Sequence, residues 1–166
     1  MSVEPILHSF SYSLGYLREQ VADVGDDQMT VQPAGVPNHP SWTIGHLVFI
    51  AQAIGGVAGL GAWLDDGWMK LFGPGSAPIS DVAVYPSKDE MLAALNEAEE
   101  RLRKAVGQLD DNALDNPFPD PAYADVFPSA RHAFTQVLVA HTGFHVGQIA
   151  VWRRAMGLPP MPRSFE

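Results

Sequence analysis

The sequence contains no cysteine. This excludes a disulfide scaffold, thiolate metal ligands and a catalytic thiol supplied by the protein itself. Charged residues are also scarce, at 17% of 166 residues, and 10 lysines and arginines face 19 aspartates and glutamates, which gives a net charge of -9. Because nucleic-acid binding needs a basic surface, this balance argues against a DNA or RNA partner. Any soft-donor chemistry must therefore come from the six histidines.

The N-terminal residues lack the basic and apolar regions of a signal peptide, so we predict a cytoplasmic protein. From Gln28 to Leu64 the chain has no Asp, Glu, Lys or Arg, and Leu47 to Leu64 is a largely apolar run of 18 residues. That length raises the question of a membrane span. However, the run contains four glycines and has acidic flanks without a lysine or arginine to orient it. We interpret it as a helix buried inside the protein and expect no membrane partner.

Apolar spacing and capping residues predict two helices in the first third of the chain. The first begins near Ser2, carries apolar residues three and four apart, and is expected to stop at Gly25 in the C′ position. The second begins after Pro40 with Ser41 as its N-cap and weakens where glycines follow.

Two further helices are predicted in the rest of the chain. The third begins at a capping box, Ser87-Lys88-Asp89-Glu90. Three acid-before-base pairs mark its solvated face: Glu97–Arg101, Glu99–Arg103 and Glu100–Lys104. The fourth begins after Pro128-Ser129 and is closed by Gly157 and Pro159, so it spans about 27 residues or roughly 40 Å.

The segments Gly61–Pro86 and Asp110–Pro128 are rich in Pro, Gly and Asp, and a short helix is expected around Trp63–Phe72. There is no alternating strand pattern and no linker between domains. We therefore predict an all-α fold with a single domain over residues 1–166. Its architecture is a four-helix bundle with long connections between helices 2 and 3 and between helices 3 and 4. These connections carry no recognisable motif and are expected to shape the substrate pocket.

The fourth predicted helix carries His141 and His145, whose i,i+4 spacing lets both imidazoles reach one ion. They share an inward stripe of period 3.6 with six apolar residues: Phe134, Val137, Leu138, Phe144, Ile149 and Trp152. The plain alternative is two core histidines that are each satisfied by a hydrogen bond. Two buried imidazoles repel when charged and need partners when neutral, and a shared metal would answer both needs. The spacing alone leaves both interpretations open.

His46 is the third candidate ligand, because it shares an inward face of the second helix with Trp42 and Phe49. If the second and fourth helices are neighbours, His46, His141 and His145 converge. Three imidazoles with an open fourth position are typical of a catalytic zinc-type site. Without cysteine ligands, the candidate metals are zinc, nickel and iron(II).

The remaining polar candidates are weaker. Three histidines are expected at the surface or at a boundary: His8, His39 and His132. Gln148 lies three residues after His145 and is either an orienting group for metal-bound water or substrate, or a polar residue at the bundle end. Trp42 and Trp152 either line a pocket or belong to the core.

Three segments together resemble the DinB-like superfamily of metal-binding four-helix bundles. They are Ser41-Trp42-Thr43-Ile44-Gly45-His46-Leu47, His141-x-x-x-His145-x-Gly147-Gln148-Ile149 and Arg153-Arg154-Ala155-Met156-Gly157-Leu158-Pro159. The resemblance runs from about Pro5 to Pro160. It implies an up-down-down-up bundle, a homodimer, and a divalent metal held by His46, His141 and His145. Characterised relatives join or isomerise small electrophiles with a low-molecular-weight thiol such as bacillithiol, mycothiol or glutathione.

The leading hypothesis is therefore a divalent-metal-dependent enzyme, most simply a thiol-dependent transferase that acts on a small electrophile. A metal-dependent hydrolase on the same site is one alternative, because metal-bound hydroxide is also a nucleophile. A non-catalytic metal- or ligand-binding protein is the other, since no glutamate or other obvious general base accompanies the motif. The expected partner is a small-molecule substrate.

Overall fold

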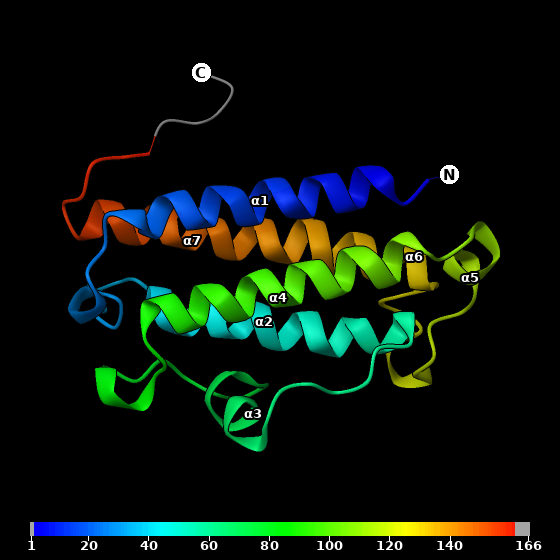
Figure 1. Ribbon diagram of the computed structural model, residues 1–166, viewed down its shortest axis with the longest axis horizontal. Coiled ribbons are helices and arrows are strands. Elements are labelled where there is room, and N and C mark those ends of the chain that lie inside the picture. The colour runs from blue at the N-terminus through cyan, green and yellow to red at the C-terminus, as the bar shows by residue number, and fades with distance from the viewer. Residues whose placement is uncertain (1, 162–166) are drawn as a thin grey trace.

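The computed structural model describes residues 2–161, so residues 1 and 162–166 of the predicted domain lie outside the described part. Every regular element in residues 2–161 is helical, which confirms the all-α prediction (Figure 1). The long elements are α1 (Glu4–Ala22), α2 (Pro40–Gly55), α4 (Lys88–Gly107) and α7 (Thr142–Ala155). α6 (Ala130–Phe134) leads into α7 through a π-helical segment, Thr135–His141.

The four long segments lie side by side and enclose the core. α2 packs against α4 and α7, and α1 packs against α4, α7 and the π-helical segment. In Figure 1, α2 and α4 run in one direction and α1 and α6–α7 in the other. The core contains fully buried residues from each segment: Leu14, Leu17, Ile44, Leu95, Leu102, Phe134 and Ile149. Burial of each such side chain contributes roughly 1.5–3 kcal/mol. This packing holds α2 beside the start of α7.

The end of α1 is closed by an ion pair rather than by glycine. The helix ends at Ala22, and Gly25 is extended with φ -73°, so the prediction of a left-handed C′ stop at Gly25 is wrong. Asp23 is the C-cap, and its carboxylate accepts two hydrogen bonds, of 2.6 and 2.9 Å, from the Arg153 guanidinium. Arg153 also donates to the Gln20 carbonyl at the helix end. A buried cation from α7 thus satisfies groups that a glycine turn would otherwise satisfy.

The start of α2 corrects two predictions. The N-cap is His39 and not Ser41, because Pro40 occupies the first helical position. His39 Nδ1 accepts the Trp42 backbone N–H at 3.2 Å, and Nε2 donates to the Ile79 carbonyl at 3.1 Å. His39 is completely buried, so its assignment to the surface or a boundary is also wrong. Burial lowers its pKa, which keeps Nδ1 free to accept the capping bond.

The start of α4 follows the prediction, and its charged face differs. The capping box is present, with the Ser87 N–H donating to Glu90 Oε2 at 2.9 Å. Glu97 pairs with Arg101 as expected. Glu99, however, binds Arg18 of α1 at 2.6 Å, and Arg103 donates to Ser11 of α1. The expected Glu99–Arg103 pair is therefore replaced by contacts that join α4 to α1.

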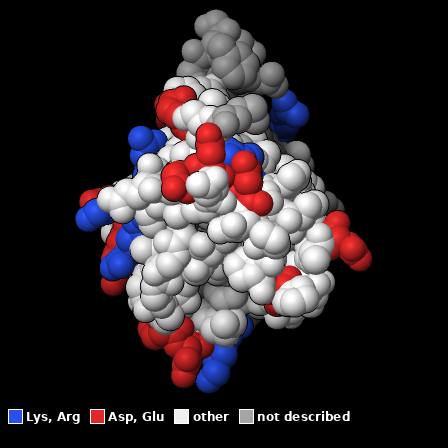
Figure 2. Space-filling model, turned by 90° about the vertical axis from the view of Figure 1, so that its right-hand side faces the viewer, with Lys and Arg blue, Asp and Glu red and all other residues white. Residues whose placement is uncertain are grey.

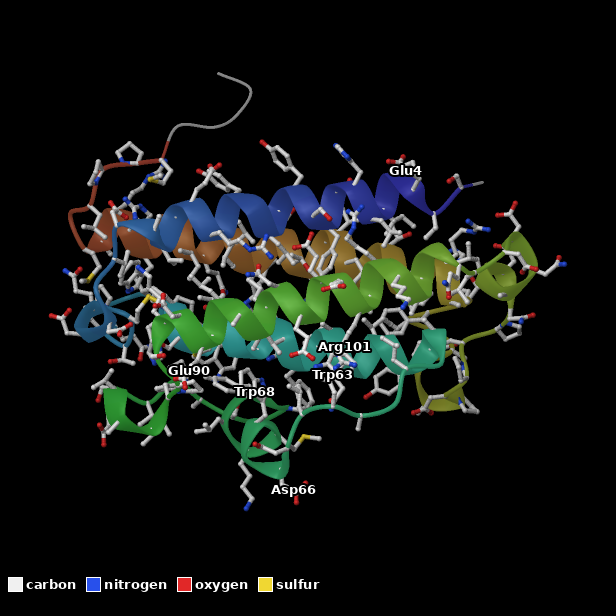
Figure 3. The ribbon with its side chains drawn as sticks, viewed as in Figure 1. Glu4, Trp63, Asp66, Trp68, Glu90 and Arg101 are labelled. Atoms are coloured by element: carbon white, nitrogen blue, oxygen red, sulfur yellow. The ribbon has the colours of Figure 1, made fainter. Side chains whose placement is uncertain are left out.

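The connection between α2 and α4 is held against both helices (Figure 3). It contains α3 (Asp66–Phe72), which confirms the short helix expected around Trp63–Phe72. The Trp68 indole donates to the Gly45 carbonyl at 3.0 Å, and Arg101 lies over the Trp63 ring at 5.3 Å. Short helices also occur in the next connection, at α5 (Asp111–Asp115) and at Pro121–Tyr123.

By length and composition, the helical stretch Pro40–Ala58 passes the test for a membrane span. In the folded chain, 61% of its apolar window is buried against the rest of the molecule. A core helix of a globular domain gives this pattern. The prediction of a buried helix is confirmed for Pro40–Gly55, which supplies His46. The run from Leu47 to Leu64 is not helical throughout, because a 3-10 turn follows at Gly56–Ala58 and residues 59–64 lie outside any helix.

Candidate metal centre

Three histidines meet where α2 faces the junction of the π-helical segment with α7. Each of His46, His141 and His145 offers one ring nitrogen, and the three nitrogens lie within 4.8 Å of one another. The Nε2 atoms of His46 and His141 are 3.3 Å apart. The His141 and His145 ring centroids are 4.5 Å apart, and those of His46 and His145 are 4.9 Å apart. The predicted convergence of the three rings is confirmed.

The π-helical segment ends with His141, one of the three histidines, and was not predicted. The Thr142 hydroxyl donates to the Val137 carbonyl five residues earlier, at 3.1 Å. Such wide turns inside α-helices occur frequently at functional sites. Beyond it, His145 and Ile149 are buried, whereas Phe144 is 64% exposed. Phe144 was expected on the inward stripe, but it lies about 100° around the helix from His145.

The His46 ring is fixed by the connection that follows α2. Its Nδ1 lies 2.8 Å from the Phe72 carbonyl oxygen, which can only accept, so Nδ1 carries the proton. The lone pair is then on Nε2, toward His141. The Trp42 indole stacks on the ring, with centroids 4.7 Å apart and planes 9° apart. Trp42 thus supports the site, whereas Trp152 is buried in the core and donates to the Val31 carbonyl.

His145 is fixed by an amide network. Its Nδ1 lies 2.9 Å from Gln148 Oε1, and the same oxygen accepts a 2.9 Å hydrogen bond from the Asn38 side chain. An amide oxygen that receives both bonds requires a proton on His145 Nδ1. The Nε2 lone pair is therefore available. Gln148 contacts a histidine directly, a role that differs from the predicted contact with water or substrate.

All three rings are neutral at physiological pH. Burial lowers the pKa of His46, and burial together with the neighbouring His46 lowers the pKa of His141 to about 4. Burial and then the nearby His141 and His46 lower the pKa of His145 to about 4. His141 Nδ1 is buried without a hydrogen-bond partner among the described residues. Neutral imidazoles with free lone pairs are the form that binds metal.

These residues fit a divalent ion. In a tetrahedral site with metal–nitrogen bonds of about 2.0–2.1 Å, two ligand nitrogens lie roughly 3.3 Å apart. The His46–His141 nitrogen separation is 3.3 Å. Metal-binding histidines usually donate their second N–H to a carbonyl or carboxylate, as His46 and His145 donate to oxygens here. Three nitrogen ligands leave one position open, and the all-nitrogen set suits zinc, nickel or iron(II).

A family model described as the DinB superfamily matches residues 10–149. The chain belongs to the DinB superfamily. The matched range contains all three histidines and Gln148, and it confirms the resemblance seen in the motifs. No curated protein and no solved structure matched the chain.

Beside the cluster, this DinB protein has a pocket of about 580 Å³ that reaches His141. Its walls come from α2, from Pro74 in the connection between α2 and α4, and from the connection before α6, including Phe118 and Tyr123. Both long connections contribute to this pocket, as expected. His8 and His132 are exposed, as predicted, and His132 is bonded to Ser129.

Sequence reasoning missed Asn38 and the role of His39. Asn38 lies 110 residues before Gln148 and belongs to no motif, so only the tertiary fold reveals it. The cap at His39 had a signal, because a proline favours the first helical position and the N-cap then precedes it. The pocket aromatics had no signal, since their spacing in the loop is irregular.

Proposed function

We propose that this protein is a divalent-metal-dependent enzyme, and that it transfers a low-molecular-weight thiol to a small electrophile. The observation that carries the proposal is the cluster of three neutral histidines beside an apolar pocket, whose lining includes one of them, His141. A metal centre that opens into a pocket is suited to catalysis, whereas structural metal sites are usually closed. The choice of a low-molecular-weight thiol as the co-substrate follows from the family resemblance.

When bound by the three histidines, a divalent ion lowers the pKa of a thiol or water at its open fourth position and so supplies a nucleophile near neutral pH. The residues of the chain would position it. Phe72 and Gln148 hold protons on the Nδ1 atoms of His46 and His145, which directs both Nε2 atoms inward. The pocket next to His141 would hold the electrophile away from bulk water.

A reaction panel tests the proposal. The protein is loaded with zinc, nickel or iron(II) and mixed with glutathione, bacillithiol or mycothiol and with chlorodinitrobenzene or monochlorobimane. We expect at least one pair to react faster than with metal-free protein or with the His46→Ala variant. A parallel assay follows nitrophenyl acetate without thiol. Ester hydrolysis alone would indicate the hydrolase, and no metal-dependent rate in either assay would indicate a binding protein.

The remaining features of the proposal follow the family and the composition. The course of α1, α2, α4 and α6–α7 supports the up-down-down-up four-helix bundle. The homodimer is proposed from the resemblance, and a cytoplasmic location is proposed with it. The acidic charge supports a small-molecule substrate over nucleic acid, and the burial of α2 supports a protein without a membrane partner.

A further inference from the structure

The pocket beside the histidines is lined mainly by apolar and aromatic side chains. The α2 residues that line it lie between Phe49 and Ile54, toward the C-terminal end of that helix. This end of α2 lies on the side of the molecule that Figure 2 faces, the right-hand side of Figure 1, and uncharged residues cover much of that side. Phe49 and Ile50 of α2 line the pocket, as do Val137 and His141 of the π-helical segment. A volume of about 580 Å³ is in the range of small-molecule sites, roughly 300–1,000 Å³.

Three aromatic rings from the connection before α6 also line the pocket and contact one another. The centroids of Phe118 and Phe127 are 5.1 Å apart, and Tyr123 lies 6.2 Å from each of them. Tyr123 and Phe127 are nearly parallel, with planes 20° apart. Aromatic walls favour an apolar or aromatic ligand body, because such rings bury large areas and stack on other rings.

The charged side chain in the pocket lining is acidic. Among the described residues that line it there is one carboxylate, Asp120, and no lysine or arginine. Asp120 Oδ1 accepts the Ala122 backbone N–H at 2.9 Å, which fixes the side chain at the start of a helical turn. The chain as a whole carries a net charge of -9. Apart from an ion held by the histidines, a carboxylate or phosphate on a ligand would therefore meet repulsion and find no cation in this wall.

We infer that the pocket takes the electrophile, and that this electrophile is a largely apolar molecule, uncharged or cationic, with a body the size of one or two aromatic rings. Its body contacts Phe118, Tyr123 and Phe127, and its reacting end points to His141. The thiols named above carry carboxylates or polar sugars, so they would approach from outside this pocket. The inference rests on the proposed function, because it assigns the pocket to the substrate of the metal centre.

Three ligands with the same ring system test this preference. Naphthylmethanol, naphthylmethylamine and naphthoic acid are titrated by calorimetry at neutral pH into the zinc-loaded full chain and again after chelation. The acid and the amine are compared after chelation, because a carboxylate can also bind the zinc ion itself. We expect the alcohol and the amine to bind, and the acid to bind at least about tenfold more weakly than the amine. Ala53→Trp places an indole in the pocket wall and should abolish binding of all three. Ala93→Trp on the exposed face of α4 is its control.

Asp120→Asn isolates the charge, because an amide oxygen still accepts the Ala122 N–H. This variant should reduce the preference for amine over acid several-fold and leave alcohol binding unchanged. Asp110→Asn is the matched control, since Asp110 also caps a helical turn and does not line the pocket. Equal or tighter binding of the acid, or unchanged binding in Ala53→Trp, would overturn the inference. Failure of the metal centre would appear separately, as absence of bound zinc in the same samples.

Discussion

Asn38 donates a 2.9 Å hydrogen bond to Gln148 Oε1, the oxygen that also accepts the Nδ1–H of His145. Asn38 belongs to the loop before α2, and Gln148 belongs to α7. The loop thus acts on the histidine through one intermediate side chain. A partly buried amide whose oxygen receives two N–H groups has little freedom to rotate. The contact fixes the orientation of the His145 ring.

This network predicts that Gln148 strengthens metal binding. We expect Gln148→Ala to weaken zinc affinity about 10–100-fold, because groups that orient metal ligands typically contribute this much. Asn38→Ala should weaken it less, since the Gln148–His145 bond remains. Competition with a chromophoric chelator measures both. Asn96→Ala is the control, because the Asn96 amide joins α4 to Arg18 away from the site, and an equal loss there would contradict the assignment.

The low pKa values of the cluster predict acid sensitivity of the metal-free protein. His141 and His145 titrate near 4 when folded, below their ordinary 6.5, so between these values the unfolded chain binds more protons. The free energy of unfolding should therefore fall as the pH is lowered from 6.5 to 4. Urea denaturation at several pH values measures this. The His141→Gln/His145→Gln double variant should show a shallower decline than wild type, and the exposed control His8→Gln should not.

Gly45 allows a close contact between α2 and the Phe72 ring of α3. A Cβ atom at this position would lie 2.1 Å from the Phe72 ring, and the Phe72 carbonyl holds His46. We expect Gly45→Ala to lower the melting temperature and to weaken zinc binding, because Phe72 must move. Gly15→Ala in α1 meets no atom within 4 Å and should stabilise by about 0.5–1 kcal/mol. Thermal unfolding and chelator competition on both variants measure the two effects. Unchanged zinc affinity in Gly45→Ala would contradict the role of the Phe72 carbonyl in positioning His46.

The burial of Arg153 predicts that its substitution destabilises the protein much more than substitution of the neighbouring Arg154. The Arg153 side chain is 1% exposed, pairs with Asp23 and donates to the Pro159 carbonyl. Arg153→Met should lower the free energy of unfolding by about 2–4 kcal/mol, because it leaves the carbonyls without their donor and Asp23 without its cation. Arg154→Met, at an exposed position, should change it by less than about 0.5 kcal/mol. Denaturant unfolding compares the two, and similar losses would contradict the role of the pair.

The helices were predictable because their signals are local. Periodic apolar residues, the Ser87 capping box and the glycine at 157, which has φ 73°, each act within a few positions. The π-helical segment had no such signal, since one extra residue in a turn leaves composition unchanged, and Phe144 was misplaced as a result. The Arg153–Asp23 pair joins residues 130 apart and is visible only in the folded chain.

The candidate ligands were predictable for a related reason. His141 and His145 share one helix face by spacing, and His46 lies on an apolar face of α2, so packing those faces brings the rings together. What surrounds the ligands was not predictable. The Phe72 carbonyl, the Asn38 amide and the aromatic wall reach the site through loops, whose paths depend on tertiary contacts rather than on local pattern.

The metal content of the purified protein tests the central claim most directly. After incubation with zinc, nickel or iron(II) and removal of the excess, elemental analysis should find roughly one ion per chain, as expected for one three-histidine site. The His46→Ala and His141→Ala variants should lose the ion, whereas His8→Ala and His132→Ala should retain it. Wild-type protein without stoichiometric metal, or a His46→Ala variant that binds it as well as wild type, would contradict the account.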